Sequence, residues 1–381
     1  MNNHLRPNSK VCKVLLSSPT RLQGSYSHEN LIIEPVSPNM MGIYSIHSNR
    51  FDRFNSEVLL GRYHYMLVFD VIPEDKQSII IPDYSYYGDY ISIALSVLYG
   101  KRFDNHGMIE GSGHFWMPHY EDIITFYPRS YYPVYSIFPR KDVNINLELE
   151  NCASIIDFTL HGKNQKLSRY FFNAARFYLS SIKSIDSDLD KAYLDLITCG
   201  EILSNFYEYS EDELYGHDQK LHQLLNKLAS YNIPYEDLSF IKQRLYQVKR
   251  KFFLMLKKMI YESESFFSNT ESIVENAKFT RENIEASIKA AYDLRSRYVH
   301  VGFEFKDWIG VYADSERHMS EVQTPGLIPN VDDNELRKLI ERAPTYVGLE
   351  RMMRFALLRF LHTNGVNIHS DLDSRSQLLD E

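Results

Sequence analysis

Residues 162–182, GKNQKLSRYFFNAARFYLSSI, mark the point at which the pattern of the sequence changes. Before this stretch, short apolar runs alternate with polar residues and are separated by Pro and Gly, which is typical of β-structure. From Leu167 onward, apolar residues recur with the 3.6-residue period of an α-helix. The sequence therefore predicts an α+β protein with a β-rich first half and a helical second half.

The expected organisation is a β-rich N-terminal domain over residues 1–160, a helical domain over residues 165–369 and a disordered acidic tail over residues 370–381. In the first half we expect a helix at Tyr90–Tyr99, followed by a glycine-containing loop through Gly113. The expected strands are Leu31–Ile33, Met66–Ile72, Ser78–Ile81, Val134–Phe138 and Ile145–Leu149. The expected helices of the second half are Leu167–Ile182, Ser187–Tyr207, Lys220–Ala229, Tyr235–Tyr261, Arg281–His300 and Thr345–His362, with a long connection at Phe303–Asp332.

Composition excludes several classes of protein. The chain has 381 residues, of which 42 are basic and 50 acidic, so its net charge of −8 argues against binding duplex nucleic acid through overall charge. Its three cysteines are far apart and form no CxxC pair, which excludes a disulfide scaffold and a Cys-rich zinc module. No window approaches about 18 uninterrupted apolar residues, so we expect a soluble cytoplasmic protein without a membrane partner. Phosphate-binding loop, HExxH and GxSxG signatures are also absent.

A cluster of polar residues in the first half has two interpretations. The cluster is Asp104, His106, Glu110, His114 and His119. Imidazole and carboxylate groups are common metal ligands, but this spacing matches no face of a helix. We therefore favour a polar loop that hydrogen-bonds within the β-rich half, and we expect neither a metal nor another cofactor.

A second local feature is basic. Residues 241–259 contain seven Lys or Arg residues and no acidic residue, including Lys249, Arg250 and Lys251. One interpretation is a solvated helix face. The other is a surface that binds RNA phosphates, since Lys and Arg neutralise backbone charge without reading sequence.

The helix expected at Arg281–His300 carries the residues that suggest a function. Its apolar stripe runs through Ile284, Ile288 and Ala291, and the next position on that face is Arg295. A guanidinium on a core-facing stripe costs free energy unless it is paired or lines a pocket. Glu201, on the stripe of another expected helix, is a candidate partner.

His300 lies five residues further on, in the last turn before Gly302, where the helix dipole favours an imidazolium. Residues five apart on an ideal helix point about 140° away from each other, so Arg295 and His300 do not share one face. They converge if a twofold dimer packs this helix against its copy. Such a cleft suits attack by a ribose 2′-hydroxyl on its own phosphate, because histidine transfers protons and arginine stabilises developing charge.

The segment Arg295-Ser296-Arg297-Tyr298-Val299-His300 fits the Arg-x4-6-His motif of the HEPN superfamily, and its setting resembles that of the ApeA-type HEPN proteins. The helix around Arg169–Tyr178, the helix Lys191–Phe206 with Glu201, and the closing helix Val347–Leu361 with Arg354 and Arg359 agree with this resemblance. In the first half, Leu98–Phe103 followed by His106 and Gly107 is similar to the β-rich domain that precedes HEPN in that family.

The resemblance implies an all-α HEPN bundle and a metal-independent endoribonuclease that acts on RNA as a homodimeric toxin or anti-phage defence effector. It also implies that residues 1–160 sense a trigger, phage-derived or a nucleotide. Many active members carry Asn, Asp or His directly after the arginine, whereas this chain has Ser296.

Alternatives remain open for each residue and for the function. Arg295 and Glu201 are alternatively a purely structural buried pair, and His300 is alternatively only a helix cap. Arg297 and Tyr298 either contact phosphate or a base, or are an exposed arginine and a core tyrosine. The alternative functions are a non-catalytic HEPN module that binds a nucleotide, RNA or protein, and a bundle that only dimerises.

Overall fold

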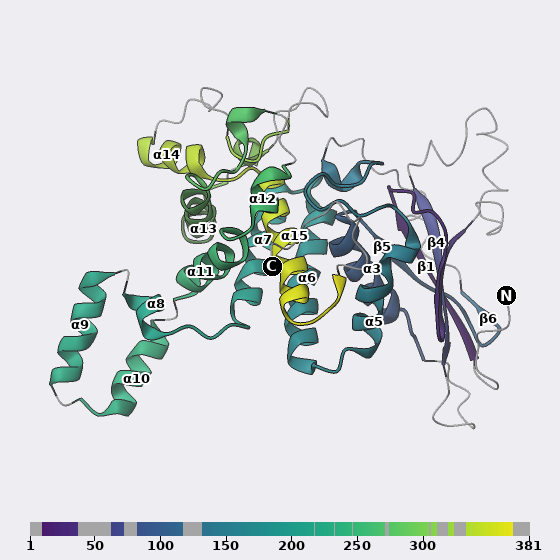
Figure 1. Cartoon of the computed structure of the whole chain (residues 1–381), viewed down its shortest axis with the longest axis horizontal. Helices are drawn as coiled ribbons and strands as arrows, with labels where there is room; N and C mark the ends of the chain where they lie inside the picture. Colours follow the sequence, from purple (N-terminus) through teal and green to yellow (C-terminus); the bar gives the residue numbers. More distant parts are fainter. Residues whose placement is uncertain are drawn as a thin grey trace.

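The computed structural model describes residues 10–36, 62–71, 82–116, 132–216, 218–231, 233–245, 247–270, 274–304, 306–310, 319–323 and 333–368. Within these residues an antiparallel sheet is followed by α-helices, so the predicted α+β class is confirmed at this level. The sheet lies at one side of the molecule and the helices extend away from it (Figure 1).

The sheet of the described residues has six strands in the order β2-β3-β4-β1-β5-β6, and its pairs are antiparallel. The strands are β1 (Lys10–Ser18), β2 (Tyr26–His28), β3 (Leu31–Val36), β4 (Tyr63–Val71), β5 (Asp104–Gly111) and β6 (His114–Phe115). Along β1, alternate side chains such as Val14 and Leu16 point into the main hydrophobic core. The helix α3 (Tyr86–Tyr99) packs on β1 and β5 and ends at Gly100, which has the expected left-handed conformation (φ +61°).

The helices after the sheet form a bundle with a projecting arm. They are α5 (Ala153–His161), α6 (Gln165–Ser184), α7 (Leu189–Ser204), α8 (Glu211–Tyr215), α9 (Gln219–Ser230), α10 (Tyr235–Arg244), α11 (Val248–Ile260), α12 (Glu264–Ser268), α13 (Ile284–Val301), α14 (Asn334–Arg342) and α15 (Tyr346–Thr363). In the bundle, α7 packs against α6, α11, α13 and α15. The arm, α8–α10, projects from the end of the molecule opposite the sheet (Figure 1).

Several expectations for the first half were wrong. Residues 133–135, which overlap the start of the expected strand Val134–Phe138, form a 3-10 turn that begins at Pro133, a residue without a backbone N–H for a sheet. Ile145–Leu149 contributes only a single bridge, Gln23 to Glu148. The glycine-containing stretch expected as a polar loop is strand β5, and neither the central strand β1 nor helix α5 was anticipated.

The expected long helix Tyr235–Tyr261 is two helices. The first, α10, pairs with α9 in the arm, whereas the second, α11, packs into the bundle against α7, α13 and α15. Residues 245–247 contain no Gly or Pro that would indicate a break in the helix. The chain divides there because the two segments bury their apolar faces against different partners.

Some expectations fall wholly or partly outside the described residues. The expected strand Ser78–Ile81 and the acidic tail at residues 370–381 are among them. In the expected connection Phe303–Asp332, the described residues include a 3-10 turn at Lys306–Ile309 and a bridge from Val322 to Pro344. Helix α14 follows this connection and was not anticipated.

One hydrophobic core crosses the boundary between the expected domains. It includes sheet residues such as Leu67, residues of α3 such as Leu95, and bundle residues such as Phe171 and Leu357. The link between α5 and α6 is short, and the side chain of Asn164 caps α6 by accepting a hydrogen bond from the Leu167 N–H. The division into domains at residues 160–165 stays a prediction.

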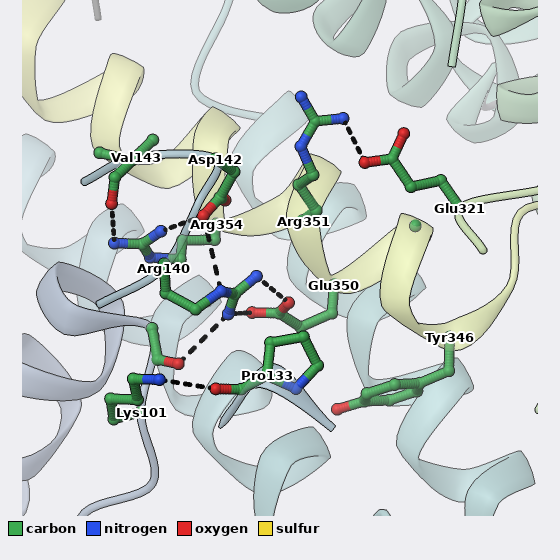
Figure 2. A network of polar contacts seen from close by, with 12 residues as sticks. Lys101, Pro133, Arg140, Asp142, Val143, Glu321, Tyr346, Glu350, Arg351 and Arg354 are labelled. Carbon is green, nitrogen blue, oxygen red and sulfur yellow. Dashed lines mark hydrogen bonds and ion pairs between the residues drawn. The ribbon is translucent and has the colours of Figure 1, made fainter. Parts of the chain in front are cut away.

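A buried polar network also joins the two halves (Figure 2). The Arg140 guanidinium forms a bidentate ion pair with Glu350 of α15, with N–O distances of 2.9 and 2.7 Å. The same carboxylate accepts a 2.5 Å hydrogen bond from the Tyr178 hydroxyl of α6. Arg140 also donates to the carbonyl of Gly100, the residue that ends α3 (3.2 Å).

Arg354 lies one turn after Glu350 on α15 and makes a similar set of contacts. It pairs with Asp142 at 2.8 Å and donates to the carbonyls of Val97 and Leu98 at the end of α3. Burial alone would raise the pKa of the Asp142 carboxyl, but the guanidinium groups of Arg140 and Arg354 hold that pKa well below its ordinary value. These side chains therefore remain charged in the interior and fix α15 against α3.

We predict that Glu350→Ala lowers the free energy of unfolding by about 3 kcal/mol, because the buried Arg140 guanidinium loses its two short contacts to Glu350 and keeps Asp142 at 3.5 Å as a carboxylate partner. Urea unfolding followed by circular dichroism measures this loss. The matched control is Glu341→Ala, which breaks the exposed Arg337–Glu341 pair and should change stability by less than about 0.5 kcal/mol. Equal stability of the two variants would contradict a structural role for the network.

A second buried polar cluster lies at one end of the sheet. Ser17 Oγ lies 2.7 Å from His106 Nε2 and accepts a hydrogen bond from Arg62 (3.0 Å). Asp104 forms ion pairs with Arg62, Arg102 and Lys183 of α6. Burial lowers the pKa of both His64 and His106 to about 4, so both imidazoles are neutral in the folded protein near neutral pH.

We predict that acidification destabilises the protein through these histidines. Their pKa values are about 4 when folded and 6.5 when unfolded, so between these values the unfolded chain binds protons that the folded chain does not. Stability is greatest above pH 6.5 and falls by about 1.4 kcal/mol per pH unit for each histidine. His106→Asn should remove one such contribution to the slope, measured by urea unfolding at several pH values, and a slope equal to that of the wild type would contradict this assignment.

Candidate functional site

Helix α13 places the Arg-x4-His segment at the surface of the bundle. Its first turns bury Ile284, Ile288 and Ala291, as the apolar stripe predicts. Arg295 follows on the same stripe, but its side chain is 28% exposed. It therefore lies at the edge of the core and not within it.

The expected partner of Arg295 is in place. Its Nη2 atom lies 3.7 Å from Oε1 of Glu201 on α7, and that carboxylate is the more buried of the two, with 15% of its side chain exposed. The Tyr292 hydroxyl donates a 2.8 Å hydrogen bond to the same Oε1 atom, and the guanidinium lies over the Tyr292 ring at 5.7 Å. Burial and the hydrogen bond to Glu201 raise the pKa of Tyr292, so this hydroxyl remains a donor. Arg295 is thus oriented by two side chains while part of it stays accessible.

His300 lies in the last turn of α13, and its side chain is exposed. The helix ends at Gly302, whose left-handed conformation (φ +68°) and hydrogen bond to the Tyr298 carbonyl form the expected cap. The residues on either side of His300 are Val299 and Val301, which are 53% and 77% exposed. The end of α13 therefore presents a histidine between two apolar side chains that the described part of the chain leaves uncovered.

Three of the four residues between Arg295 and His300 differ in their surroundings. Arg297 forms a 3.0 Å ion pair with Asp333, whose carboxylate caps α14 by accepting hydrogen bonds from the Glu335 and Leu336 N–H groups. These backbone hydrogen bonds and Arg297 lower the pKa of Asp333. Tyr298 is half-buried against the main core, which favours its structural interpretation, and Ser296 is half-buried.

The basic segment lies beside α13, but its charges are partly balanced. Lys249 of α11 forms an ion pair with Asp293, and Lys257 forms one with Glu285 at 2.6 Å. Arg250 donates a hydrogen bond to the carbonyl of Glu213 in the arm (2.9 Å). Two of the three residues proposed to contact RNA, Lys249 and Arg250, thus hold helices together, while Lys251 is half-buried.

A groove of about 730 Å³ between α13 and α14 is a feature that the sequence analysis missed. Among its lining residues are Lys289 and Asp293 from α13, and Lys338 and Arg342 from α14. Helical spacing places His300 on the same face of α13 as Lys289 and Asp293, beyond the groove, whereas Arg295 faces another direction. The signal that could have revealed α14, which forms one side of the groove, was the amphipathic pattern of residues 334–342, with Leu336 and Ile340 buried.

Two expected absences concern metals and membranes. Among the described residues, no group of three or more His, Cys, Asp or Glu side chains could hold a metal ion. Of the five residues considered as ligands, Asp104 and His106 belong to the ion pairs and hydrogen bonds around Ser17, and His119 lies outside the described residues. No helix in the described ranges combines the length and apolar character needed to cross a bilayer.

No protein-family model matches the chain, and no curated protein or solved structure matches it.

Proposed function

We propose that this chain is an ApeA-like HEPN protein, a metal-independent endoribonuclease whose active site contains Arg295 and His300. The single observation that carries the proposal is the pairing of a partly accessible, carboxylate-oriented Arg295 with an exposed His300 at the end of the same helix. Guanidinium and imidazole groups supply the charge stabilisation and the proton transfer that cleavage of RNA by its own 2′-hydroxyl requires.

In the proposed reaction, the imidazole of His300 accepts the proton of the ribose 2′-hydroxyl, and the 2′-oxygen attacks the adjacent phosphorus. The bond from phosphorus to the 5′-oxygen breaks, and that oxygen takes up a proton from an imidazolium. Arg295 stabilises the negative charge that develops on the non-bridging oxygens. Glu201 and Tyr292 act as positioning residues because they hold the guanidinium without touching RNA. The products carry a 2′,3′-cyclic phosphate and a 5′-hydroxyl.

The proposed enzyme is a homodimer formed through α13. Residues five apart on a helix point about 140° away from each other, so Arg295 and His300 of one chain approach the same phosphate poorly. A twofold axis near the end of α13 would bring two copies of each residue together. The exposed side chains of Val299 and Val301 support such contact, because apolar groups at this position gain free energy when a second copy covers them.

The proposed cellular role is that of a toxin or anti-phage defence effector, with the sheet half as the regulatory part. The buried ion pairs between the sheet half and α15 support regulation of this kind, since they connect the two halves rigidly. The alternative is a non-catalytic HEPN module that binds a nucleotide, RNA or protein. Ser296 favours this alternative, because many active members carry a more polar or titratable residue at that position.

We predict that His300→Ala and Arg295→Ala each abolish cleavage when purified protein is incubated with total RNA in EDTA and the product ends are analysed. His300→Ala should change stability by about 1 kcal/mol or less, because an exposed side chain at a helix end contributes little packing. Arg295→Ala should cost about 1–3 kcal/mol, because Glu201 loses its charged partner.

The matched controls are His222→Ala on α9 and Arg337→Ala on α14, which should cleave like the wild type. Sedimentation of the wild type should give a dimer. Cleavage retained in either site variant, or a strictly monomeric active protein, would reject the proposed site.

We further predict that replacing Lys249, Arg250 and Lys251 with glutamine weakens RNA binding and flattens its dependence on salt, while the cleavage rate at saturating RNA stays near normal. Such contacts hold ground state and transition state equally, so their loss changes affinity and not turnover. Fluorescence anisotropy across a salt series measures the slope. An unchanged slope would assign these residues only to the contacts that they make with α13 and the arm.

A further inference from the structure

The arm, α8–α10, carries many of the exposed apolar side chains of the molecule. Six of the fifteen large hydrophobic side chains that are exposed in the described residues lie on it: Leu224, Tyr231, Tyr235, Phe240, Ile241 and Leu245. The core of the arm has three buried apolar side chains among the described residues, Tyr215, Leu225 and Leu238. Exposed apolar side chains that gather on one face are typical of a surface that binds another protein.

Leu224 and Ile241 lie on one face of the hairpin that α9 and α10 form (Figure 1). Leu225 of α9 and Leu238 of α10 belong to the same buried cluster, so they mark the sides on which the two helices meet. Leu224 comes directly before Leu225, and Ile241 lies one turn after the residue directly before Leu238. In antiparallel helices, residues displaced in the same sense from the line of contact point to the same side of the pair. Leu224 and Ile241, which are 52% and 37% exposed, therefore form an apolar centre on this side.

The same side of the hairpin carries one charge of each sign. Lys220 lies one turn before Leu224 on α9, and Asp237 lies one turn before Ile241 on α10. Because the helices are antiparallel, the two charges lie on opposite sides of the apolar centre, each about 6 Å from it along the helix axis. Both side chains are exposed, and neither forms an ion pair within the described residues. We call the surface of Lys220, Leu224, Asp237 and Ile241 the arm face.

We propose that the arm face binds the arm face of a second copy of the chain. A twofold axis that lies in this face, midway between Lys220 and Asp237 and at right angles to the line joining them, exchanges the two positions. Each lysine then meets the aspartate of the other copy, and the apolar centres of both copies cover each other. The two hairpins together form a four-helix unit, which buries apolar side chains that one hairpin leaves exposed.

The charges of the arm face favour this occupant over a nucleic acid. Binding to a phosphate backbone requires a surplus of positive charge, whereas Lys220 is balanced here by Asp237. One charge of each sign on either side of an apolar centre is self-complementary, as a twofold contact between identical surfaces requires. The arm projects from the bundle, so a second copy can approach this face (Figure 1).

The arm contact is separate from the proposed contact through α13. A chain with two twofold contacts joins α13 dimers into tetramers or longer assemblies. The arm face is small, so this further assembly is expected only at high protein concentration, above that at which the α13 dimer forms.

Sedimentation velocity of the full chain tests the arm contact. The combined substitution Val299→Asp and Val301→Asp provides a background from which the proposed α13 contact is removed. In this background the chain should still associate into dimers, with a dissociation constant on the order of 10–100 µM for so small an interface. Leu224→Asp should weaken this association about tenfold or more, because it places a charge in the apolar centre. Gln223→Asp, on the outer side of α9, adds the same charge elsewhere and should associate like the background.

A mixing experiment in the same background identifies the occupant as a second copy. Lys220→Asp alone and Asp237→Lys alone should each weaken self-association, because like charges then meet at both ends of the contact. A mixture of these two variants should associate again, because opposite charges then meet at both ends. Circular dichroism should show the same helical content in all variants, since the substituted side chains are exposed.

A background that stays monomeric at all concentrations, or association equally strong in Leu224→Asp and Gln223→Asp, would overturn the proposal. A mixture that associates no better than its two components would also overturn it, and would assign the arm face to a different protein. RNA cleavage by Leu224→Asp, made in the wild-type chain, should be unchanged, so this test and the test of the RNA site fail independently.

Discussion

The arrangement of the sheet half and the helical half depends on the bidentate ion pair between Arg140 and Glu350. It is buried together with the Arg354–Asp142 pair, and both arginines also bind backbone carbonyls at the end of α3. Hydrophobic packing alone is non-directional and would tolerate α15 at several angles to α3. Ion pairs with fixed geometry allow only a narrow range of angles between these helices, because a buried charge that loses its partner raises the free energy of the folded state. Gly100 is part of this constraint, since a Cβ there would lie 2.7 Å from the Arg354 Nε atom.

The position of α15 affects the candidate site through helix α7. Helix α7 packs against α15 on one side and against α13 on another, and α7 supplies Glu201. The orientation of Arg295 therefore rests on the packing of α7, which in turn rests on the buried network. A continuous set of packed elements thus connects α3 of the sheet half, through α15 and α7, to Glu201 beside Arg295.

Periodicity in the sequence predicted much of the helical half. The helices α6, α7, α9, α13 and α15 begin and end within a few residues of the expected positions, since their apolar residues recur with the helical period. Periodicity did not predict the structure where tertiary contacts determine it. The first strand was missed because its sequence, KVCKVLLSS, does not alternate strictly between apolar and polar residues, and β5 was taken for a loop because it contains Gly107. The break between α10 and α11 was invisible because both segments are good helices.

For the site, the sequence predicted the Arg295–Glu201 pair, since a charge on an apolar stripe demands a partner. The contributions of Tyr292 and of Asp333 were not predicted. Both depend on distances between helices that are far apart in sequence, and no local pattern encodes such distances. The network around Glu350 was missed for the same reason, although Arg354 had been noticed.

The arm formed by α8, α9 and α10 has a separate core whose buried apolar side chains are Tyr215, Leu225 and Leu238. So small a cluster contributes little cooperative stability, and the arm is joined to the bundle mainly through α8 and α11. Its backbone amides should consequently exchange with solvent through local opening, at a free energy well below that of the bundle. The protein then has two thermodynamic levels, a rigid body that orders the end of α13 and a helical hairpin that can open and close while the body stays folded.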